Sequence, residues 1–243
     1  MKKRGLSQER LKLIACVTML LDHIGATIVL SMYYANPTGT LLSLYKTLRI
    51  IGRLSFPIYC FLLAEGSFHT RNPKRYALRL ALSALLSEIP YDLAFYDGIT
   101  WQHQNVMVTL FLGFLALETM KKYPQLFQKV LAAIPFALLA DIVKCDYRWE
   151  GVMLIVLFGL TRDLPHKGIL QFLGIWFLFS PGHIMAFNWL DGFSLVTQEW
   201  AVLALIPLYL YSGKKQSGNK WVQWAFYLFY PLHLLTLYVL GGL

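Results

Sequence analysis

Apolar residues form long blocks along the whole chain, and short polar segments separate them. Nine such blocks lie at roughly 11–32, 48–68, 76–95, 105–120, 126–142, 151–161, 168–187, 197–212 and 221–240. A helix needs about 17–25 apolar residues to cross a hydrocarbon core roughly 30 Å thick. The strands of a membrane barrel would instead alternate between apolar and polar residues, and this chain shows no such alternation. The pattern therefore predicts an all-α fold, a polytopic transmembrane helix bundle of about nine spans, with eight to ten possible.

The composition supports a membrane protein. Hydrophobic residues make up 57% of the chain and charged residues only 14%, with a mean hydropathy of +0.51. A soluble domain carries closer to a quarter charged residues. The basic start followed by an apolar run is similar to a signal peptide, but Asp22 and His23 interrupt the run and no small-x-small cleavage site follows. We therefore expect a retained first span and a single integral membrane domain over residues 1–243.

The basic residues are distributed unevenly between the connecting segments. Seventeen of the 22 lysines and arginines precede the first span or fall in every second connection after it. Cytoplasmic loops carry such an excess, so the amino terminus is predicted inside and the carboxyl terminus outside, in a multi-pass protein of the plasma membrane. The net charge of +9 is then explained by topology and by contact with the lipid bilayer. A nucleic-acid partner is not expected.

Several charged residues nevertheless fall inside the spans. A charge at membrane depth costs about 2.5–3.5 kcal/mol on insertion scales, so such residues usually face a bundle interior and mark function. Asp22 and His23 are adjacent in LLDHIG, past the middle of the first span. A histidine near a carboxylate can act as a general base, because the carboxylate favours the imidazolium that forms. The alternative is that Asp22 only joins two helices by pairing with a buried arginine.

The second span offers such an arginine. Arg49 and Arg53 are four residues apart and share one helical face. Arg53 is the deeper of the two and is the expected partner of Asp22, while binding of a substrate anion stays open for it. Pro57 should kink this helix. Glu65 is expected to pair with the basic HTRNPKR segment that follows it.

Two further polar residues lie at a similar predicted depth. Glu88 belongs to SEIPYD in the third span, and His233 interrupts the last span in FYPLHLLTLY. Residues that merely join helices need not share one depth. The candidate catalytic site therefore consists of residues from four spans at one level: Asp22, His23, Arg53, Glu88 and His233.

Other polar residues receive structural interpretations. Asn105, Asp141, Asp146 and Glu150 are predicted to be solvated helix ends. The cysteines Cys16, Cys60 and Cys145 are odd in number and form no CxxC pair, so neither a disulfide framework nor a zinc site is indicated. His23, His103, His183 and His233 lie on one predicted side but lack an HxxxH or similar spacing. We expect no metal site.

Five segments carry a resemblance to a known family. They read LIACVTMLLDHIG, RIIGRLSFPIYCFLLAEGSFHTRN, RLALSALLSEIPYDLAF, NVMVTLFLG and DYRWEGVMLIV, in this order. The chain resembles the TraX family of integral membrane proteins, named for a conjugal transfer protein. The likeness covers residues 11–160 well and the last third loosely.

The resemblance implies a chemistry. The founding member is linked to amino-terminal acetylation of pilin, and the family is similar to membrane acyltransferases that acetylate extracytoplasmic sugars with cytoplasmic acetyl-CoA. It thus implies acetyl-CoA as donor and a protein or glycan acceptor. In one branch of those enzymes an arginine precedes a histidine by eleven positions. Here Lys12 precedes His23 by eleven, about 16 Å along one helical face. Lys12 and the loop residues Arg71, Lys74 and Arg75 are the expected contacts of the coenzyme A phosphates.

Three functions remain open at this point. The first is an acetyltransferase in which His23 deprotonates the acceptor, Arg53 holds the acyl oxygen or an anionic acceptor, and His233 is a second proton-transfer candidate. The second is a transporter that uses the same buried residues for coupling, although no internal repeat supports it. The third is a non-enzymatic component of a surface or conjugation apparatus.

Overall fold

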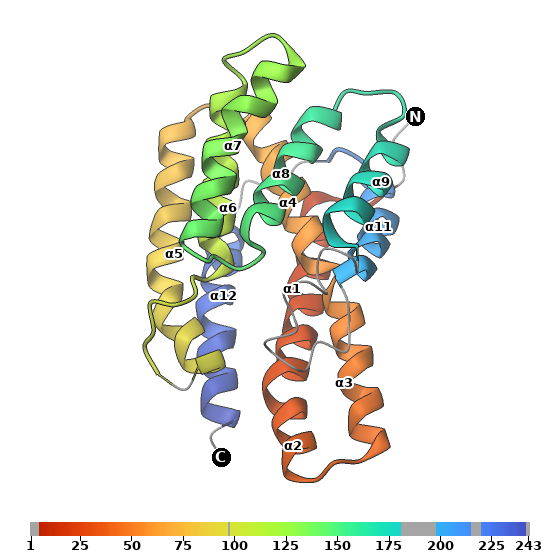
Figure 1. The fold of residues 1–243 in the computed structure, drawn as a ribbon, viewed down its shortest axis with the longest axis vertical. Helices are drawn as coiled ribbons and strands as arrows, with labels where there is room; N and C mark the ends of the chain where they lie inside the picture. The colour runs from red at the N-terminus through yellow and green to blue at the C-terminus, as the bar shows by residue number, and fades with distance from the viewer. Residues whose placement is uncertain (1–4, 97, 181–197, 215–219, 242–243) are drawn as a thin grey trace.

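Helices make up almost all of the ordered secondary structure in this computed structural model, which describes residues 5–96, 98–180, 198–214 and 220–241 (Figure 1). Within these ranges there is no strand, only isolated bridges at Leu6–Tyr211 and Gln104–Cys145. The helices, in order, are α1 (Gln8–Ile24), α2 (Leu30–Ala35), α3 (Gly39–Gly52), α4 (Ser55–His69), α5 (Pro73–Tyr96), α6 (Val106–Met120), α7 (Leu126–Ile142), α8 (Arg148–Thr161), α9 (Lys167–Phe179), α11 (Leu205–Tyr209) and α12 (Lys220–Gly241).

The all-α membrane bundle is confirmed. Three helical stretches of the described residues are long and apolar enough to cross a bilayer, namely Gln8–Ala35, Gly39–His69 and Trp224–Gly241. Val106–Met120 and Lys167–Phe179 are shorter apolar helices. Each predicted span overlaps a helical segment, although the second helical stretch begins at 39 rather than 48. Residues 181–187 of the seventh predicted span and His183 lie outside the described residues.

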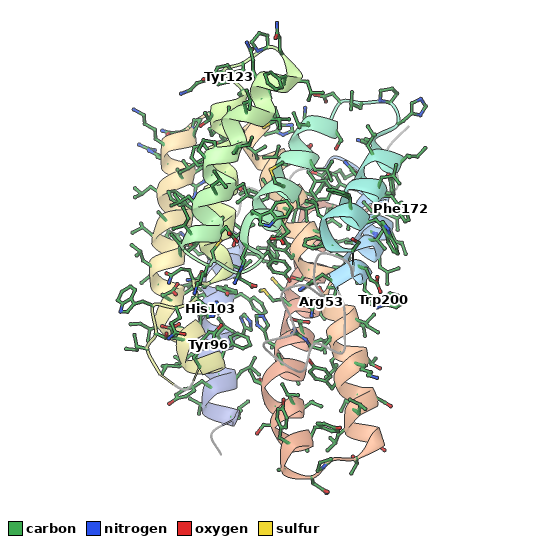
Figure 2. The ribbon with its side chains drawn as sticks, in the orientation of Figure 1. Arg53, Tyr96, His103, Tyr123, Phe172 and Trp200 are labelled. Carbon is green, nitrogen blue, oxygen red and sulfur yellow. The ribbon has the colours of Figure 1, made fainter. Side chains whose placement is uncertain are left out.

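The helices alternate in direction as the charge pattern predicted. The α4–α5, α6–α7 and α8–α9 junctions lie at one end of the molecule, with Tyr123 of the α6–α7 junction labelled there (Figures 1 and 2). The described chain ends at the opposite end, after α12. Three of the connections rich in basic residues therefore share one end.

Helix α1 changes its winding just after the Asp22–His23 pair. Residues Gly25–Val29 form one turn of π-helix, η1, before α2 continues the same rod. The Thr27 hydroxyl donates to the His23 carbonyl at 2.7 Å inside this turn. Such single π turns occur often at functional sites, because they rotate the side chains on either side out of the regular α-helical order.

A break separates α3 from α4 at Arg53 and Leu54. The amide of Arg53 still donates to the carbonyls of Arg49 and Ile50, and α4 then starts at Ser55. The kink predicted for this span is thus a short turn, and Pro57 lies in the first turn of α4. Proline is tolerated there because the first amides of a helix have no partner within it.

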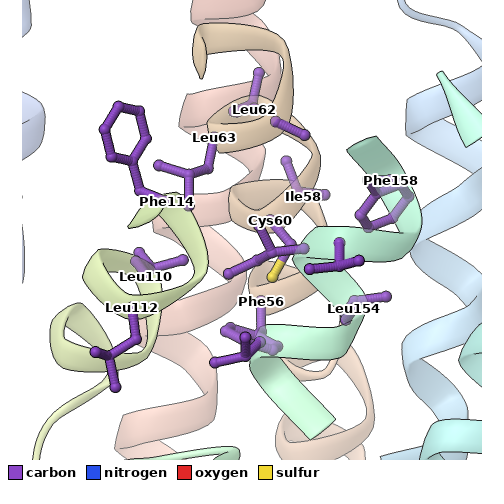
Figure 3. Close-up of a cluster of buried hydrophobic side chains, with 14 of the residues drawn as sticks. Phe56, Ile58, Cys60, Leu62, Leu63, Leu110, Leu112, Phe114, Leu154 and Phe158 are labelled. Carbon is purple, nitrogen blue, oxygen red and sulfur yellow. The ribbon is translucent and has the colours of Figure 1, made fainter. Parts of the chain in front are cut away.

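Helices α4, α6 and α8 form the centre of the apolar core (Figure 3). Phe114, Ile58 and Phe158 are all at most 1% exposed. Gly113 on α6 allows the close approach, since an added Cβ would collide with Ile155 of α8. Helix α12 packs on α5 and on α1, and this contact brings the last helix to the first.

Candidate active site

Two histidines from opposite ends of the chain form the centre of the candidate site. Nδ1 of His23 lies 2.7 Å from Nε2 of His233, and the two rings are nearly parallel with centroids 5.0 Å apart. The second nitrogen of His233, Nδ1, lies 2.8 Å from the carbonyl oxygen of Phe229. His23 and His233, which were predicted to lie at a similar depth, are thus in direct contact and join α1 to α12.

This chain of contacts assigns the protons of both neutral rings. A carbonyl oxygen can only accept, so Nδ1 of His233 must carry its proton. Nε2 of neutral His233 is then an acceptor, and Nδ1–H of His23 donates a hydrogen bond to it. Nε2 of His23 is left with a lone pair, and no partner for it occurs within the described ranges. His23 lines a cavity, whereas His233 is 6% exposed and lies behind it. His23 therefore offers a base to the cavity.

Asp22 does not orient His23, and its partner is not the one predicted. Its Oδ2 accepts from Nη1 of Arg49 at 2.6 Å, in an ion pair that is largely withdrawn from solvent. The prediction that Arg53 pairs with Asp22 is wrong. Arg49 lies one helical turn earlier on α3, level with Asp22, while Arg53 lies in the turn after α3.

Gly52 explains how α3 comes so near to Asp22. A Cβ atom at this position would collide with the Asp22 carboxylate. Only glycine leaves the backbone of α3 free to approach that side chain. The ion pair of Asp22 with Arg49 thus depends on the residue just before Arg53.

Arg53 lines the same cavity without an ion-pair partner. Arg53 is 5% exposed, and its Nε is buried without a hydrogen-bond partner. No carboxylate among the described residues lies within ion-pair distance of its guanidinium. Figure 2 places Arg53 well inside the molecule, between the two ends. A buried guanidinium in this state is an available donor for an anion or for a developing oxyanion.

Asp146 enters the cavity from the loop between α7 and α8, although the sequence predicted a solvated helix end. The Asp146 amide donates to the Gln104 carbonyl at 2.8 Å, and the Asp146 carbonyl accepts from the Thr109 hydroxyl. The next residue, Tyr147, stacks on Phe56 with centroids 3.7 Å apart. Burial raises the pKa of the Asp146 carboxyl to about 6, against the opposing influence of the Arg53 guanidinium.

The backbone of this loop is strained. Lys144, Tyr147 and Arg148 have φ of 51°, 60° and 38°, a region that side chains other than glycine rarely occupy. Such strain persists only where surrounding contacts enforce it, and it concentrates at functional sites. Asp146 was missed because sequence alone does not show that a loop folds back into the bundle. Its place in the DYRWEGVMLIV segment was the available signal.

The cavity runs along α1 from the histidine to the opposite end of the helix. It has a volume of about 420 Å³ and includes both His23 and Lys12 in its wall. Lys12 lies over the Phe226 ring at 5.2 Å. Apolar side chains line the stretch between these ends, among them Leu62, Leu63, Leu80 and Leu110. The predicted common face of Lys12 and His23 is therefore occupied by one continuous cavity.

Glu88 is not brought to this cavity. Its carboxylate accepts from the side-chain and backbone amides of Asn105. Asn105 is fully buried, also donates to the Ala84 carbonyl at 2.9 Å, and caps α6 by accepting from the Met107 amide at 2.9 Å. The solvated end predicted for Asn105 is wrong, while Asp141 is exposed as expected. Glu88 and Asn105 thus anchor α6 on α5.

The basic loop residues also lie away from the cavity wall. Arg71, Lys74 and Arg75 are exposed at the α4–α5 junction. The main partner of Glu65 is Arg162, whose Nε donates to its Oε1 at 2.8 Å; within the predicted HTRNPKR segment, His69 alone lies within ion-pair distance, at 3.9 Å. Arg79 was not among the predicted coenzyme A contacts, but it is nearer to the cavity. Its Nε donates to the Tyr227 hydroxyl at 3.3 Å, and Tyr227 lines the cavity.

In the described part of the chain, no group of three His, Cys, Asp or Glu side chains is placed to hold a metal ion. His103 stacks on Tyr96, a cavity residue, at 5.4 Å (Figure 2). The three cysteines are buried and free.

Comparison with known proteins gives the family. Residues 7–241 match the family described as "TraX protein". The chain belongs to the TraX family. This TraX-family chain is 31% identical over 241 residues to "Probable fimbrial assembly protein FimC, serogroup H1" of Dichelobacter nodosus, covering 94% of the chain and 93% of that relative. It is 29% identical over 106 residues to an uncharacterized protein of Rickettsia prowazekii (strain Madrid E), covering 44% of the chain and 34% of that relative. No solved structure matches.

Proposed function

We propose that this TraX-family protein is a membrane acetyltransferase of the cytoplasmic membrane, which transfers the acetyl group of acetyl-CoA to an acceptor on the outer side. The observation that carries the proposal is the lone pair of His23 Nε2, presented to a cavity that reaches Lys12 at the other end. An acetyltransferase needs a base beside the acceptor and a passage through which the donor's thioester reaches it.

In the proposed reaction, an acceptor hydroxyl or amine attacks the thioester carbonyl carbon. His23 Nε2 takes the acceptor proton as the new C–O or C–N bond forms. The C–S bond then breaks, and the thiolate of coenzyme A takes the proton back from His23. The His23 imidazolium keeps its Nδ1–H bond to His233 throughout, so His233 stabilises the charged ring without contacting the substrate.

Lys12 supplies a cation at the donor end of the cavity. Eleven residues of α-helix place it about 16 Å from His23, with the aromatic rings of Phe226 and Tyr227 lining the same end. A lysine binds a phosphate as a point charge. Lys12 is therefore proposed to contact the coenzyme A phosphates, and the pantetheine arm is proposed to lie along the cavity. Arg71, Lys74 and Arg75 are proposed to attract the donor to this face at longer range.

The test is acetyl transfer in membranes that contain the protein. Labelled acetyl-CoA is added, and surface proteins and glycans are examined by intact-mass and glycan mass spectrometry. Removal of the base in His23→Gln should lower transfer by about 10²–10⁴-fold. His166→Gln, at an exposed position before α9, is the matched control and should retain activity. Full activity of His23→Gln would exclude the mechanism.

The name of the D. nodosus relative supports a second candidate. It describes that protein as a fimbrial assembly protein, and the two chains are alike over nearly their full lengths. The present chain would then serve the assembly of a surface appendage, either as a non-enzymatic component or by acetylating an appendage subunit. Cells with His23→Gln separate the two, because a non-enzymatic component would still support assembly. Flux through proteoliposomes without acetyl-CoA would indicate a transporter instead.

A further inference from the structure

Arg53 is a buried cation of the cavity wall that forms no ion pair with any described carboxylate. Its neighbour on the same side, Arg49, is neutralised by Asp22 at 2.6 Å. Arg53 is more deeply buried, at 5% exposure, and no described carboxylate lies within 4.0 Å of it; Nε lacks an acceptor in both arginines. A buried charge without a partner is costly, so a ligand that supplies one gains the full strength of a charge-assisted contact.

Asp146 shares the cavity with Arg53 but is held short of it. The loop is fixed from both sides, by the Gln104 and Thr109 contacts and by Tyr147 on Phe56. Both side chains line the cavity, but they form no ion pair with each other. The gap leaves the guanidinium fork of Arg53 accessible to a ligand.

The donor cannot fill this place if acetyl-CoA binds as proposed. Its only anionic groups are the phosphates, and these belong at Lys12, separated from the thioester by the pantetheine arm. The thioester oxygen carries charge only during the reaction, so a permanent anion near Arg53 and His23 must come from the acceptor. We propose that Arg53 forms a subsite for an anionic acceptor, one that carries a carboxylate or a phosphate close to the hydroxyl or amine to be acetylated. The identification of the anion as an acceptor rests on the proposed acetyl transfer, whereas anion binding at Arg53 does not depend on it.

The chemistry of the subsite selects among acceptors. A guanidinium offers two parallel N–H donors that fit carboxylate and phosphate alike. A uronic acid would supply the carboxylate, and a glycerol phosphate unit of a lipid or polymer would supply the phosphate. A neutral sugar offers neither and would leave Arg53 unpaired. Because Asp146 competes for Arg53 at longer range when it is ionised, its protonation should favour the anion.

The experiment measures anion binding to the purified full-length protein without acetyl-CoA. Glucuronate, glycerol 3-phosphate and glucose are titrated by calorimetry and by thermal shift at constant ionic strength. We expect binding of at least one anion, no binding of glucose, and a loss of about tenfold or more in affinity in Arg53→Gln. Arg148→Gln, whose side chain is 33% exposed in a longer pair with Asp141, is the control and should bind as the unaltered protein does.

Each outcome decides the matter. Preference for glucuronate or for glycerol 3-phosphate identifies the carboxylate or the phosphate source. Absence of binding by both anions, or an unchanged affinity in Arg53→Gln, overturns the subsite. If Arg53→Gln does not fold, Asp146→Asn is measured: tighter anion binding supports the subsite and unchanged binding overturns it. Anion binding in a protein without acetyl transfer would sink the proposed function alone.

Discussion

Nδ1 of His23 and Nε2 of His233 lie 2.7 Å apart although 210 positions separate them in the chain. The contact joins the first long helix to the last and, through the Phe229 carbonyl, assigns the proton on each ring. It makes His233 a positioning residue, whose effect reaches the cavity only through His23. This role differs from that of a second base, and the difference can be measured.

Replacing His233 tests that role. His233→Leu removes the acceptor of the His23 Nδ1 proton, so the wrong tautomer of His23 becomes populated and acetyl transfer should fall by about tenfold or more. His233→Gln keeps an oxygen that can accept this proton and should recover much of the activity. Imidazole ¹⁵N shifts of His23 report the tautomer directly. An unchanged spectrum in His233→Leu would contradict the assignment.

Gly52→Ala should destabilise the protein. The new methyl group collides with the Asp22 carboxylate, and forced shifts of this kind cost about 1–3 kcal/mol. Gly39→Ala is the matched control on the same helix, because nothing lies within 4 Å of its added Cβ. Thermal unfolding in detergent compares the two. Equal midpoints would show that α3 can move away from Asp22 without cost.

The ion pair between Asp22 and Arg49 should show strong coupling in a double-mutant cycle. Removing one partner leaves a largely buried charge and should cost about 3–5 kcal/mol, while Asp22→Asn combined with Arg49→Gln should cost less than the sum. Asp141 and Arg148 form a longer and more exposed pair at 3.7 Å, for which coupling below about 1 kcal/mol is expected. If Asp22 coupled to Arg53 instead, the assigned pairing would be refuted.

Asp146 should make the stability depend on pH. Its folded-state pKa of about 6 exceeds the ordinary 3.8, so the folded protein holds this proton more tightly than the unfolded chain does. The resulting stabilisation is complete below about pH 4 and is lost as the pH rises through about 6, by roughly 1–3 kcal/mol. Unfolding midpoints between pH 4 and 8 measure it. Asp146→Asn should flatten the curve, whereas the exposed Asp141→Asn should not.

Lys12→Gln should weaken the use of acetyl-CoA. Loss of the cation at the donor end should raise KM for acetyl-CoA by about tenfold and change kcat less, because Lys12 is remote from the reacting atoms. Arg10→Gln is the control on the same helix, since Arg10 is exposed and outside the cavity. A lowered kcat with an unchanged KM would place Lys12 in a different role.

The helical membrane fold could be read from the chain alone. Block length, hydropathy and the one-sided distribution of basic residues depend on local composition, and a bilayer imposes the same demands on any chain. His23 and Lys12 on one face likewise follow from helical spacing. The depth of a residue follows from its position in its own span, so the sequence could place His23 and His233 at one level.

The partners of these residues were decided by the tertiary structure. Which arginine meets Asp22 depends on one helical turn of register between α1 and α3, and on the small size of Gly52. Glu88 turns to Asn105, and Asp146 reaches the cavity through a strained loop fixed by contacts on other helices. Spacing along one helix cannot encode such relations, because they are set by packing between elements far apart in sequence.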